Sequence, residues 1–392
     1  MSAVLAINAG SSSLKFALFG TDAAPLARGE VERLGLAANF TTQVGAARQA
    51  RDVVAASLPQ ALDVALDWIA RRYGDLEIAA VAHRVVHGGT RYAAPVVLDD
   101  AVLRELEGFD PLAPQHQPFN LAAARALRLR FPNALPVACF DTAFHATWSD
   151  SAQRLPLPRR LHDAGVRRYG FHGLSYEYLS ARVRELAPQA SRVILAHLGS
   201  GASVCAVRDG RSVDATMGFS TLGGLPMATR CGEIDPGVIF HLQRAHGMSV
   251  ADIERLMYHD SGLRGMSGIG GDLRALLADA GVAARQAIDV FVQRCTQAIG
   301  AMAATLGGVD ALVFSGGIGA HAPAVRAMIC APLGFLGIEL DAAANAHNAD
   351  AIGAAHVPVY ALVTDEERVL AQHALALLTR QRGGLRVAES ES

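Results

Sequence analysis

Two short turns carry the residue types that phosphate groups need. The segment INAGSSSLKF places Ser11, Ser13 and Lys15 around Gly10, directly after an apolar run. Glycine and serine let backbone N–H groups converge on one concavity, and such a nest suits phosphate oxygens. The segment HLGSGAS, which starts at His197, repeats this pattern nearly half the chain later. An ordinary tight turn explains either segment alone, whereas two phosphate-binding turns are what a nucleotide requires.

Two further glycine-rich segments could contact the rest of a nucleotide. FSGGIG follows an apolar run, and its glycines at 316, 317 and 319 allow close approach of a base or ribose. A strand-to-helix turn explains this segment equally well. GIGGDLR offers Asp272 and Arg274, although here the start of a solvated helix is the favoured interpretation.

Four ionisable residues stand at the ends of apolar runs or in glycine-rich turns: Arg84 in HRVVHGG, Asp141 in FDTAFH, His172 in RYGFHG and Arg230 in MATRCGEIDPG. Each has another explanation by itself, such as helix capping for Asp141, a structural hydrogen bond for His172 or surface charge for the arginines. Two arginines, one acid and one imidazole beside phosphate-type turns together indicate phosphoryl transfer.

Strand-like and helix-like segments must position these residues. The hydrophobic patterns predict strands at 4–8, 15–19, 78–84, 136–140, 193–197, 203–207, 311–315 and 357–362. They predict amphipathic helices at 60–73, 119–131, 175–186, 250–258, 282–306 and 366–380. This mixture favours an α/β architecture with mixed sheets covered by helices. The repeated strand–turn–strand pattern suggests two related halves.

Composition excludes several classes of protein. The chain has 392 residues, which predicts two or three domains. Its 35 basic and 37 acidic residues nearly balance, so no electrostatic argument supports a nucleic-acid or acidic-membrane partner. The five cysteines are odd in number and form no CxxC pair, which favours free thiols in a cytoplasmic location. Neither a signal peptide nor a membrane span is expected.

The motifs INAGSSSLKF, HRVVHGG, FDTAFH, RYGFHG, HLGSGAS, MATRCGEIDPG and GGIG, in this order and spacing, resemble those of acetate kinase and the acetate/propionate kinase family. The resemblance runs from Val4 to about Gln372. It implies two duplicated actin-like/ribonuclease H-like α/β domains (the acetate and sugar kinase/Hsp70/actin fold) with an interdomain cleft, and a homodimer. The expected domains are 1–146 plus the returning helix 367–392, and a nucleotide-binding domain at 147–366.

The resemblance also implies roles for individual residues. Arg84 and Arg230 would hold the carboxylate and the transferring phosphoryl group, Asp141 would position the reactants, and His172 would stabilise the phosphoryl group. Asn8 and Glu366 would help to hold Mg²⁺, for which Mn²⁺ could substitute. The implied nucleotide-binding set is Lys15, Ser11, Ser13, His197, Gly199, Ser200, Gly201, Asp272, Leu273, Arg274, Gly316, Gly317, Ile318, Gly319 and His321. Val86 and Phe171 would line the pocket for the acyl group.

Several positions depart from the family pattern. Ser200 stands where HLGNG has Asn, and GIGAH, with His321, replaces GIGEN. Gln115 and Thr221 occupy acyl-pocket positions that are often Leu and Pro. RYGFHG continues as LSY, with Tyr176, where TSH is usual. These differences leave the acyl-chain and nucleotide preferences open.

The expected reaction is the reversible, Mg²⁺-dependent transfer of the γ-phosphate of ATP to acetate, which gives acetyl phosphate and ADP. A short carboxylic acid has a pKa of about 4 and is already ionised at neutral pH, so its attack needs no general base. The difficulty is to bring one anion to another, which two guanidinium groups and a metal ion overcome. The alternatives are a kinase for propionate or another short acid and, further away, a sugar kinase or an actin-like nucleotide switch.

Overall fold

The computed structural model describes residues 2–35 and 37–390, with side chains as far as Gln381. The chain divides into two compact units, Met1–Ala143 with Asp365–Ser392 (unit 1) and Phe144–Thr364 (unit 2). The unit boundaries precede the predicted domain boundaries by up to three residues. The second boundary lies next to the start of the last helix at Glu366, which packs against the unit 1 sheet. Residues 1, 36 and 391–392, which the predicted domain at 1–146 plus 367–392 includes, lie outside the described residues.

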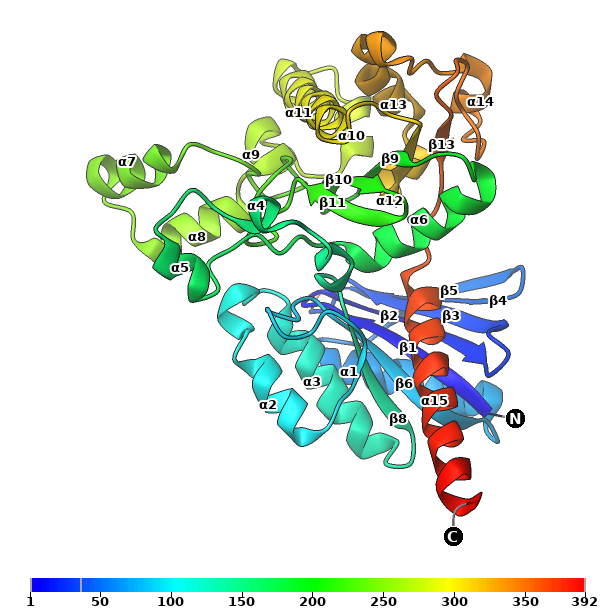
Figure 1. Ribbon diagram of the computed structural model, residues 1–392. Helices are drawn as coiled ribbons and strands as arrows, with labels where there is room; N and C mark the ends of the chain where they lie inside the picture. The colour runs from blue at the N-terminus through cyan, green and yellow to red at the C-terminus, as the bar shows by residue number, and fades with distance from the viewer. Residues whose placement is uncertain (1, 36, 391–392) are drawn as a thin grey trace. The chain divides into compact units, whose positions relative to one another are not determined.

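Unit 1 is built on one eight-stranded sheet with the strand order β5-β4-β3-β2-β1-β6-β8-β7 (Figure 1). Its strands are β1 (Ser2–Ala9), β2 (Ser13–Gly20), β3 (Pro25–Glu32), β4 (Ala38–Val44), β5 (Ala47–Val53), β6 (Glu77–Val85), β7 (Val96–Val97) and β8 (Leu135–Phe140). The parallel neighbours β1, β6 and β8 form its centre, and antiparallel hairpins extend it through β2 to β5.

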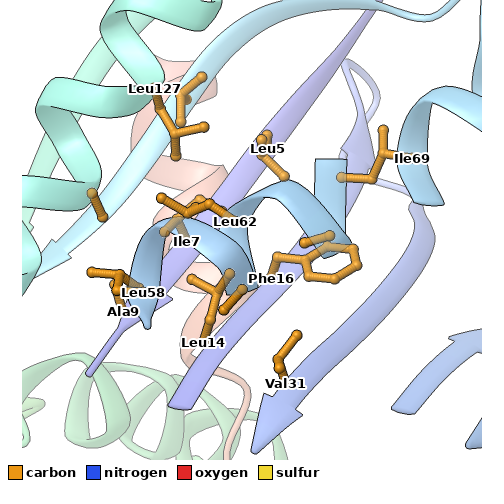
Figure 2. Close-up of a cluster of buried hydrophobic side chains, with 14 of the residues drawn as sticks. Leu5, Ile7, Ala9, Leu14, Phe16, Val31, Leu58, Leu62, Ile69 and Leu127 are labelled. Carbon is orange, nitrogen blue, oxygen red and sulfur yellow. The ribbon is translucent and has the colours of Figure 1, made fainter. Parts of the chain in front are cut away.

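Helices cover both faces of the central strands, which explains why β1 and β2 are apolar on both faces. Leu5, Ile7 and Phe16 pack in one core with residues of α1 (Leu58–Tyr73) and α3 (Gln117–Arg130), as Figure 2 shows. The returning helix α15 (Glu366–Ser390) packs against β1 and β6. The sheet is therefore buried around the carboxyl ends of β1, β6 and β8, where the candidate residues lie.

Unit 2 is built on a five-stranded sheet with the order β11-β10-β9-β12-β13. Its strands are β9 (Arg192–Leu198), β10 (Ala202–Arg208), β11 (Arg211–Ala215), β12 (Ala311–Ser315) and β13 (Val359–Ala361). Helix α6 (Gly173–Leu186) contributes to a core with these strands, and α11 (Val282–Leu306) packs against β9 and β10.

The two sheets share one topology. In unit 1 the order β3-β2-β1-β6-β8 joins its strands by two antiparallel pairs and then two parallel pairs. In unit 2 the order β11-β10-β9-β12-β13 has the same sequence of pairs. The predicted α/β class with two duplicated halves is therefore confirmed.

Several elements depart from the expectations. The strands β3, β4, β5, β7 and β11 were not predicted: β7 has only two residues, the buried face of β4 includes the polar Thr42, and β5 is almost wholly exposed. GGIG directly follows β12 and forms the start of a helix, α12 (Gly316–His321), which agrees with the interpretation of this segment as a strand-to-helix turn. The other helices are α2 (Asp100–Glu107), η1 (Asp110–Leu112), η2 (Ala143–His145), α4 (Asp150–Gln153), α5 (Arg159–Asp163), α7 (Pro236–His246), α8 (Val250–His259), α9 (Gly262–Ser267), α10 (Leu273–Ala278), α13 (Pro323–Cys330), η3 (Ala331–Leu336) and α14 (Ala342–Ala346).

Within the described residues, no helix combines the length and the apolar character that crossing a membrane would demand. All five cysteines have free thiols.

Candidate active-site residues

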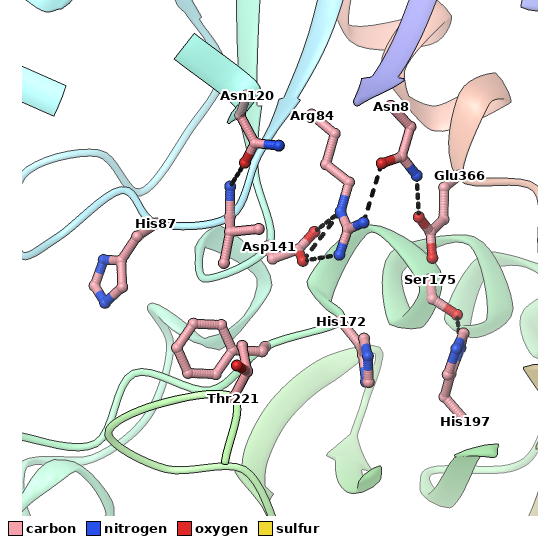
Figure 3. A network of polar contacts seen from close by, with 12 residues as sticks. Asn8, Arg84, His87, Asn120, Asp141, His172, Ser175, His197, Thr221 and Glu366 are labelled. Carbon is pink, nitrogen blue, oxygen red and sulfur yellow. Dashed lines mark hydrogen bonds and ion pairs between the residues drawn. The ribbon is translucent and has the colours of Figure 1, made fainter. Parts of the chain in front are cut away.

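A buried ion pair lies at the carboxyl ends of two strands in unit 1. Arg84 is the penultimate residue of β6 and Asp141 directly follows β8, its parallel neighbour, so both side chains reach one edge of the sheet. Arg84 donates from Nε and Nη2 to the Asp141 carboxylate, at 3.0 and 2.6 Å (Figure 3). The side chain of Asp141 is 2% exposed and that of Arg84 21%. Such a two-pronged pair fixes the plane of the guanidinium as well as its position.

Two more side chains extend this group, which we call the charged cluster: Asn8, Arg84, Asp141 and Glu366. Arg84 Nη1 donates to Asn8 Oδ1 at 3.1 Å, and Asn8 Nδ2 donates to Glu366 Oε2 at 3.4 Å (Figure 3). Burial disfavours the charge on Arg84, but Asp141 and Glu366 outweigh this effect and raise the pKa of the guanidinium above its usual value. Arg84 is thus a permanent and oriented positive charge.

Two amide side chains of α3 hold the loop that follows Arg84. The backbone N–H of Val86 donates to Asn120 Oδ1, and that of His87 donates to Gln117 Oε1, both at 3.0 Å. Both amides are buried. Sequence reasoning missed them, although a buried amide at the start of an amphipathic helix is a detectable signal, because such a group needs a polar partner.

The first hairpin turn has the expected shape, but Lys15 has another partner. The N–H of Gly10 donates to the carbonyl of Ser13 at 2.8 Å, and Ser11 is exposed at the tip. Lys15 Nζ lies 3.4 Å from Glu30 Oε1 on β3. Burial lowers the pKa of Lys15, but Glu30, Glu367 and Glu366 together raise it above the usual value. A role for Lys15 at a phosphate would require it to leave Glu30.

The charged cluster offers few ligands for a divalent metal. Among the described residues, no three His, Cys, Asp or Glu side chains are grouped as metal ligands. Mg²⁺ usually takes only one or two carboxylates and completes its shell with water and substrate phosphates. The carboxylate of Glu366 fits that requirement, whereas Asn8 Oδ1 already accepts from Arg84. The residues present therefore fit a metal that arrives with a nucleotide.

Two stacked imidazoles form the candidate site of unit 2. His172 is the N-cap of α6 in the left-handed region (φ 61°), a conformation that costs free energy in a residue other than glycine. Its Nδ1 lies 2.8 Å from Ser203 Oγ, and Nδ1 of His197 lies 2.8 Å from Ser175 Oγ. The ring centroids are 4.5 Å apart, at an interplanar angle of 27°. A serine hydroxyl thus orients each ring.

Gly201, in the β9–β10 turn, brings His172 and Arg230 to one place. A Cβ atom on Gly201 would lie 3.2 Å from His172 Nε2 and 3.7 Å from Arg230 Nη2. Arg230 Nη1 donates to the carbonyl of Thr221 at 2.8 Å. An imidazole and a guanidinium beside a glycine turn can bind an anionic oxygen. Of the rest of this turn, the N–H of Gly199 donates to the carbonyl of Gly201 at 2.9 Å, and the carbonyl of Ser200 accepts from Ala228.

His145 positions the loop before His172, and sequence reasoning missed it. Its Nε2 donates to the carbonyl of Phe171 at 2.9 Å, and its Nδ1 lies 2.8 Å from Ser212 Oγ. Trp148 Nε1 donates to the same hydroxyl at 2.7 Å. Burial lowers the pKa of His145 to about 4, so the ring is neutral. His145 stands inside the motif FDTAFH, and its burial is what the sequence did not reveal.

The residues expected around adenosine lie in two helix starts. Gly316 has a φ of 75°, and a Cβ there would lie 2.5 Å from the carbonyl oxygen of Leu198. Gly317 is exposed, Ile318 is half-buried, and the buried Arg326 donates to the carbonyl of Gly319 at 2.9 Å. His321, at the end of α12, is exposed.

Asp272 caps α10 and forms a 2.8 Å ion pair with Arg274 on the surface. Leu273 between them is buried in the packing of α10. No hydrogen bond or ion pair among the described residues links these three to the glycines of α12.

The predicted acyl-pocket residues are divided between the units. Val86 (buried) and Gln115 (half-buried) belong to unit 1, and Phe171 and Thr221, both buried, belong to unit 2. The backbone carbonyl of Thr221 accepts a hydrogen bond from Arg230, so this contact does not depend on the Thr221 side chain.

Comparison with known proteins assigns the family. The model of the Acetokinase family matches residues 3–372. An acetate kinase of Methylocella silvestris is 46% identical, over 96% of this chain and 98% of the relative. A propionate kinase structure from Francisella tularensis has a TM-score of 0.89 at 32% identity, over 95% of this chain and 99% of that one. The Porphyromonas gingivalis acetate kinase structure has a TM-score of 0.85 at 34% identity, over 96% and 100%.

Both structural relatives extend over nearly the full length of this chain, and the family match includes every motif named above. The resemblance found in the sequence is thereby confirmed: the chain belongs to the acetokinase family.

Proposed function

We propose that the chain transfers the γ-phosphate of ATP reversibly to acetate and forms acetyl phosphate and ADP. Family membership supports this reaction class, and the Arg84–Asp141 pair is the observation that carries it. A half-buried guanidinium with a fixed plane suits a planar carboxylate or phosphate, and it has no evident purpose in a site that only hydrolyses a nucleotide.

In the proposed mechanism one carboxylate oxygen of acetate attacks the γ-phosphorus, and the bond to the β-γ bridging oxygen breaks in line. Arg84 binds the acceptor, while Arg230 and the Nε2 side of His172 bind phosphoryl oxygens as their charge rises. Asp141 holds Arg84 in place and removes no proton, because acetate is already ionised at neutral pH. The residues of unit 1 would thus bind and orient the acceptor, and those of unit 2 would bind the phosphoryl oxygens.

ATP would bind through the glycine-rich turns of unit 2 and through α12. The hairpin at Ser11 and Ser13 would contact its phosphates. Glu366 would hold Mg²⁺, or Mn²⁺ in its place, and Asn8 would join it on releasing Arg84. When bound, that ion would neutralise phosphate charge. The oxygen-only donor set and the few protein ligands support this choice.

Trapping of the product with hydroxylamine tests the proposal. The protein is incubated with Mg·ATP and formate, acetate, propionate or butyrate, and acyl hydroxamate is measured. We expect hydroxamate from acetate, and its loss in R84A and R230A. ATP hydrolysis without hydroxamate from any acid would overturn the proposal.

The same assay addresses a propionate kinase as the second candidate. The similarity to the Francisella tularensis propionate kinase favours this alternative, as do Gln115 and Thr221 at acyl-pocket positions. One methylene contributes only about 1–3 kcal/mol to discrimination, so both acids should react, in a ratio that kcat/KM reports. A higher kcat/KM for propionate would replace acetate as the preferred substrate.

We further propose a homodimer in the cytoplasm. Helix α7 supports the homodimer, because none of its residues is buried and its Val238 and Phe240 are exposed. The five free thiols support a reducing compartment. Sedimentation equilibrium tests the assembly: a dimer is expected, and V238D/F240D should shift it toward the monomer.

A further inference from the structure

Tyr176 is a residue of unit 2 for which the proposed mechanism has no role. It is fully buried in α6, one turn after His172. Its hydroxyl makes a short hydrogen bond with Ser203 Oγ, the same atom that contacts Nδ1 of His172. The three side chains therefore form a continuous row from the core to the candidate site.

The direction of the hydrogen bonds in this row follows from counting protons. Among the described residues, Ser203 Oγ has two polar neighbours, His172 Nδ1 and the Tyr176 hydroxyl. Tyr176 has Ser203 Oγ and the backbone of His197, which stabilises the phenolate and thus acts as a donor. The only acceptor for the phenolic proton in this part of the chain is therefore Ser203 Oγ.

The opposite direction leaves a proton without a partner. If His172 donated from Nδ1 to Ser203, and Ser203 donated to Tyr176, the buried phenolic proton would have no acceptor. A buried donor without a partner costs about 1–3 kcal/mol. Burial also raises the pKa of Tyr176 well above its usual value, so the phenol keeps its proton at neutral pH.

The molecule contains a second row of the same kind, whose direction is set by its two ends and the neutral ring of His145, although Ser212 Oγ also contacts Cys205 Sγ at 3.3 Å. Trp148 Nε1 can only donate and the carbonyl of Phe171 can only accept, so protons run from Trp148 through Ser212 to His145. That row places the proton of His145 on Nε2. Unit 2 thus already fixes one histidine tautomer through a serine hydroxyl and an aromatic donor.

We propose that Tyr176 is a positioning residue: through Ser203 it directs a proton toward Nδ1 of His172 and keeps the other proton on Nε2. His172 then presents an Nε2–H donor on the side where Gly201 and Arg230 lie. The benefit to catalysis rests on the proposed function, because a phosphoryl oxygen needs a donor and an Nδ1–H tautomer would offer it a lone pair. The tautomer itself is independent of the reaction.

The tautomer can be read directly by NMR. The full-length protein is prepared with ¹⁵N-labelled histidine, and H172Q identifies the His172 signals among those of the 14 histidines. Long-range ¹H–¹⁵N spectra at pH 7.5 should show His172 as neutral, with the proton on Nε2. In Y176F the Nδ1 signal should move toward the value of a protonated nitrogen. S203A provides a second variant with the same expected shift.

Kinetics then separate positioning from general damage. Y176F should lower kcat roughly fivefold and change either KM less than twofold, because one hydrogen bond about 1 kcal/mol in strength no longer sets the tautomer. The double variant Y176F/S203A should be no slower than S203A alone. Y73F, which removes a 3.1 Å hydrogen bond from Tyr73 to Leu26 in unit 1, is the matched control and should behave like the unmodified protein.

A proton on Nδ1 of His172 in the unmodified protein would overturn the proposal, and so would Y176F with unchanged spectra and kcat. If the spectra are as expected but no acid gives hydroxamate, the proposed function fails while the positioning role of Tyr176 stands.

Discussion

The two duplicated sheets carry different side chains at corresponding strand ends: unit 1 has mainly charged groups, and unit 2 has hydroxyl and imidazole groups. At the end of the parallel strand next to the central one, unit 1 has Arg84 in the charged cluster, whereas unit 2 has Ser315, a small neutral residue. Beside the central hairpin, Asn8 and Lys15 in unit 1 correspond to His197 and Ser203 in unit 2. A conserved strand order therefore fixes where side chains project, and leaves their charge free to differ.

The two sets of side chains also differ in the free energy that their burial costs. Unit 1 keeps a desolvated charge pair that is stable only as a pair, while unit 2 uses hydroxyls, imidazoles and backbone groups that cost little to bury when they are hydrogen-bonded. Arg230, the arginine of the candidate site in unit 2, lies in a segment outside the sheet. It is oriented by its hydrogen bond to the backbone carbonyl of Thr221.

The largest expected effect comes from breaking the pair in unit 1. R84L removes the two-pronged Arg84 contact of Asp141, whose side chain is 2% exposed, and should lower the free energy of unfolding by about 3–5 kcal/mol. S203A in unit 2 leaves the buried Tyr176 hydroxyl without its acceptor and should cost less, about 1–3 kcal/mol. Urea denaturation at pH 7 measures both. R84L/D141L should regain most of the stability but none of the activity, and equal losses in R84L and S203A would contradict the comparison.

A smaller effect concerns the acid sensitivity caused by one buried histidine in each unit. Burial lowers the pKa of His83 in unit 1 to about 3 and that of His145 in unit 2 to about 4. Since the unfolded chain binds a proton near pH 6.5, each histidine contributes stability that is lost as the pH falls below this value. Because the unfolded chain takes up a proton at each of these positions, each histidine should lower the free energy of unfolding by about 2 kcal/mol between pH 7 and pH 5.

Their replacements should differ in sign at neutral pH. Neither ring nitrogen of His83 has a partner among the described residues, whereas both of His145 are hydrogen-bonded. H83L should therefore stabilise the protein and remove its share of the acid sensitivity, while H145L should destabilise it. Denaturation curves at pH 5 and pH 7 give both values, and stabilisation by H145L would refute this distinction.

The smallest effect concerns Ser315, whose buried Oγ has no hydrogen-bond partner in the described part of the chain. S315A should raise the free energy of unfolding by about 1 kcal/mol, because it removes an unsatisfied polar group. Differential scanning calorimetry without nucleotide is the suitable measurement. A lower melting temperature would mean that the hydroxyl contributes to stability at this strand end after all.

Most of the central fold was predictable from the sequence, and the reason is burial. Strands such as β1, β9 and β12 are continuous apolar runs, so hydrophobicity alone predicts them. The exposed strand β5 contains two arginines and a glutamine and forms by pairing with β4, which a local pattern does not reveal.

The candidate residues divide in a similar way. Arg84, Asp141, His172 and Arg230 were predicted because a charged side chain after an apolar run or beside glycine is unusual. Their assigned roles stay predictions. The supporting residues, among them Gln117, Asn120 and His145, escaped notice because ordinary polar residues become informative only when the fold buries them beside a partner.

The return of α15 to unit 1 affects the order in which the protein can fold during synthesis. Unit 1 needs residues from both sides of unit 2 in the sequence, so its sheet lacks the helix that covers β1 and β6 until unit 2 has been translated. At about 5–20 residues per second, this interval is on the order of tens of seconds. Unit 2 can therefore complete its core on the ribosome. In unit 1, the apolar surface of β1 and β6 that α15 later covers stays accessible to chaperones during this interval.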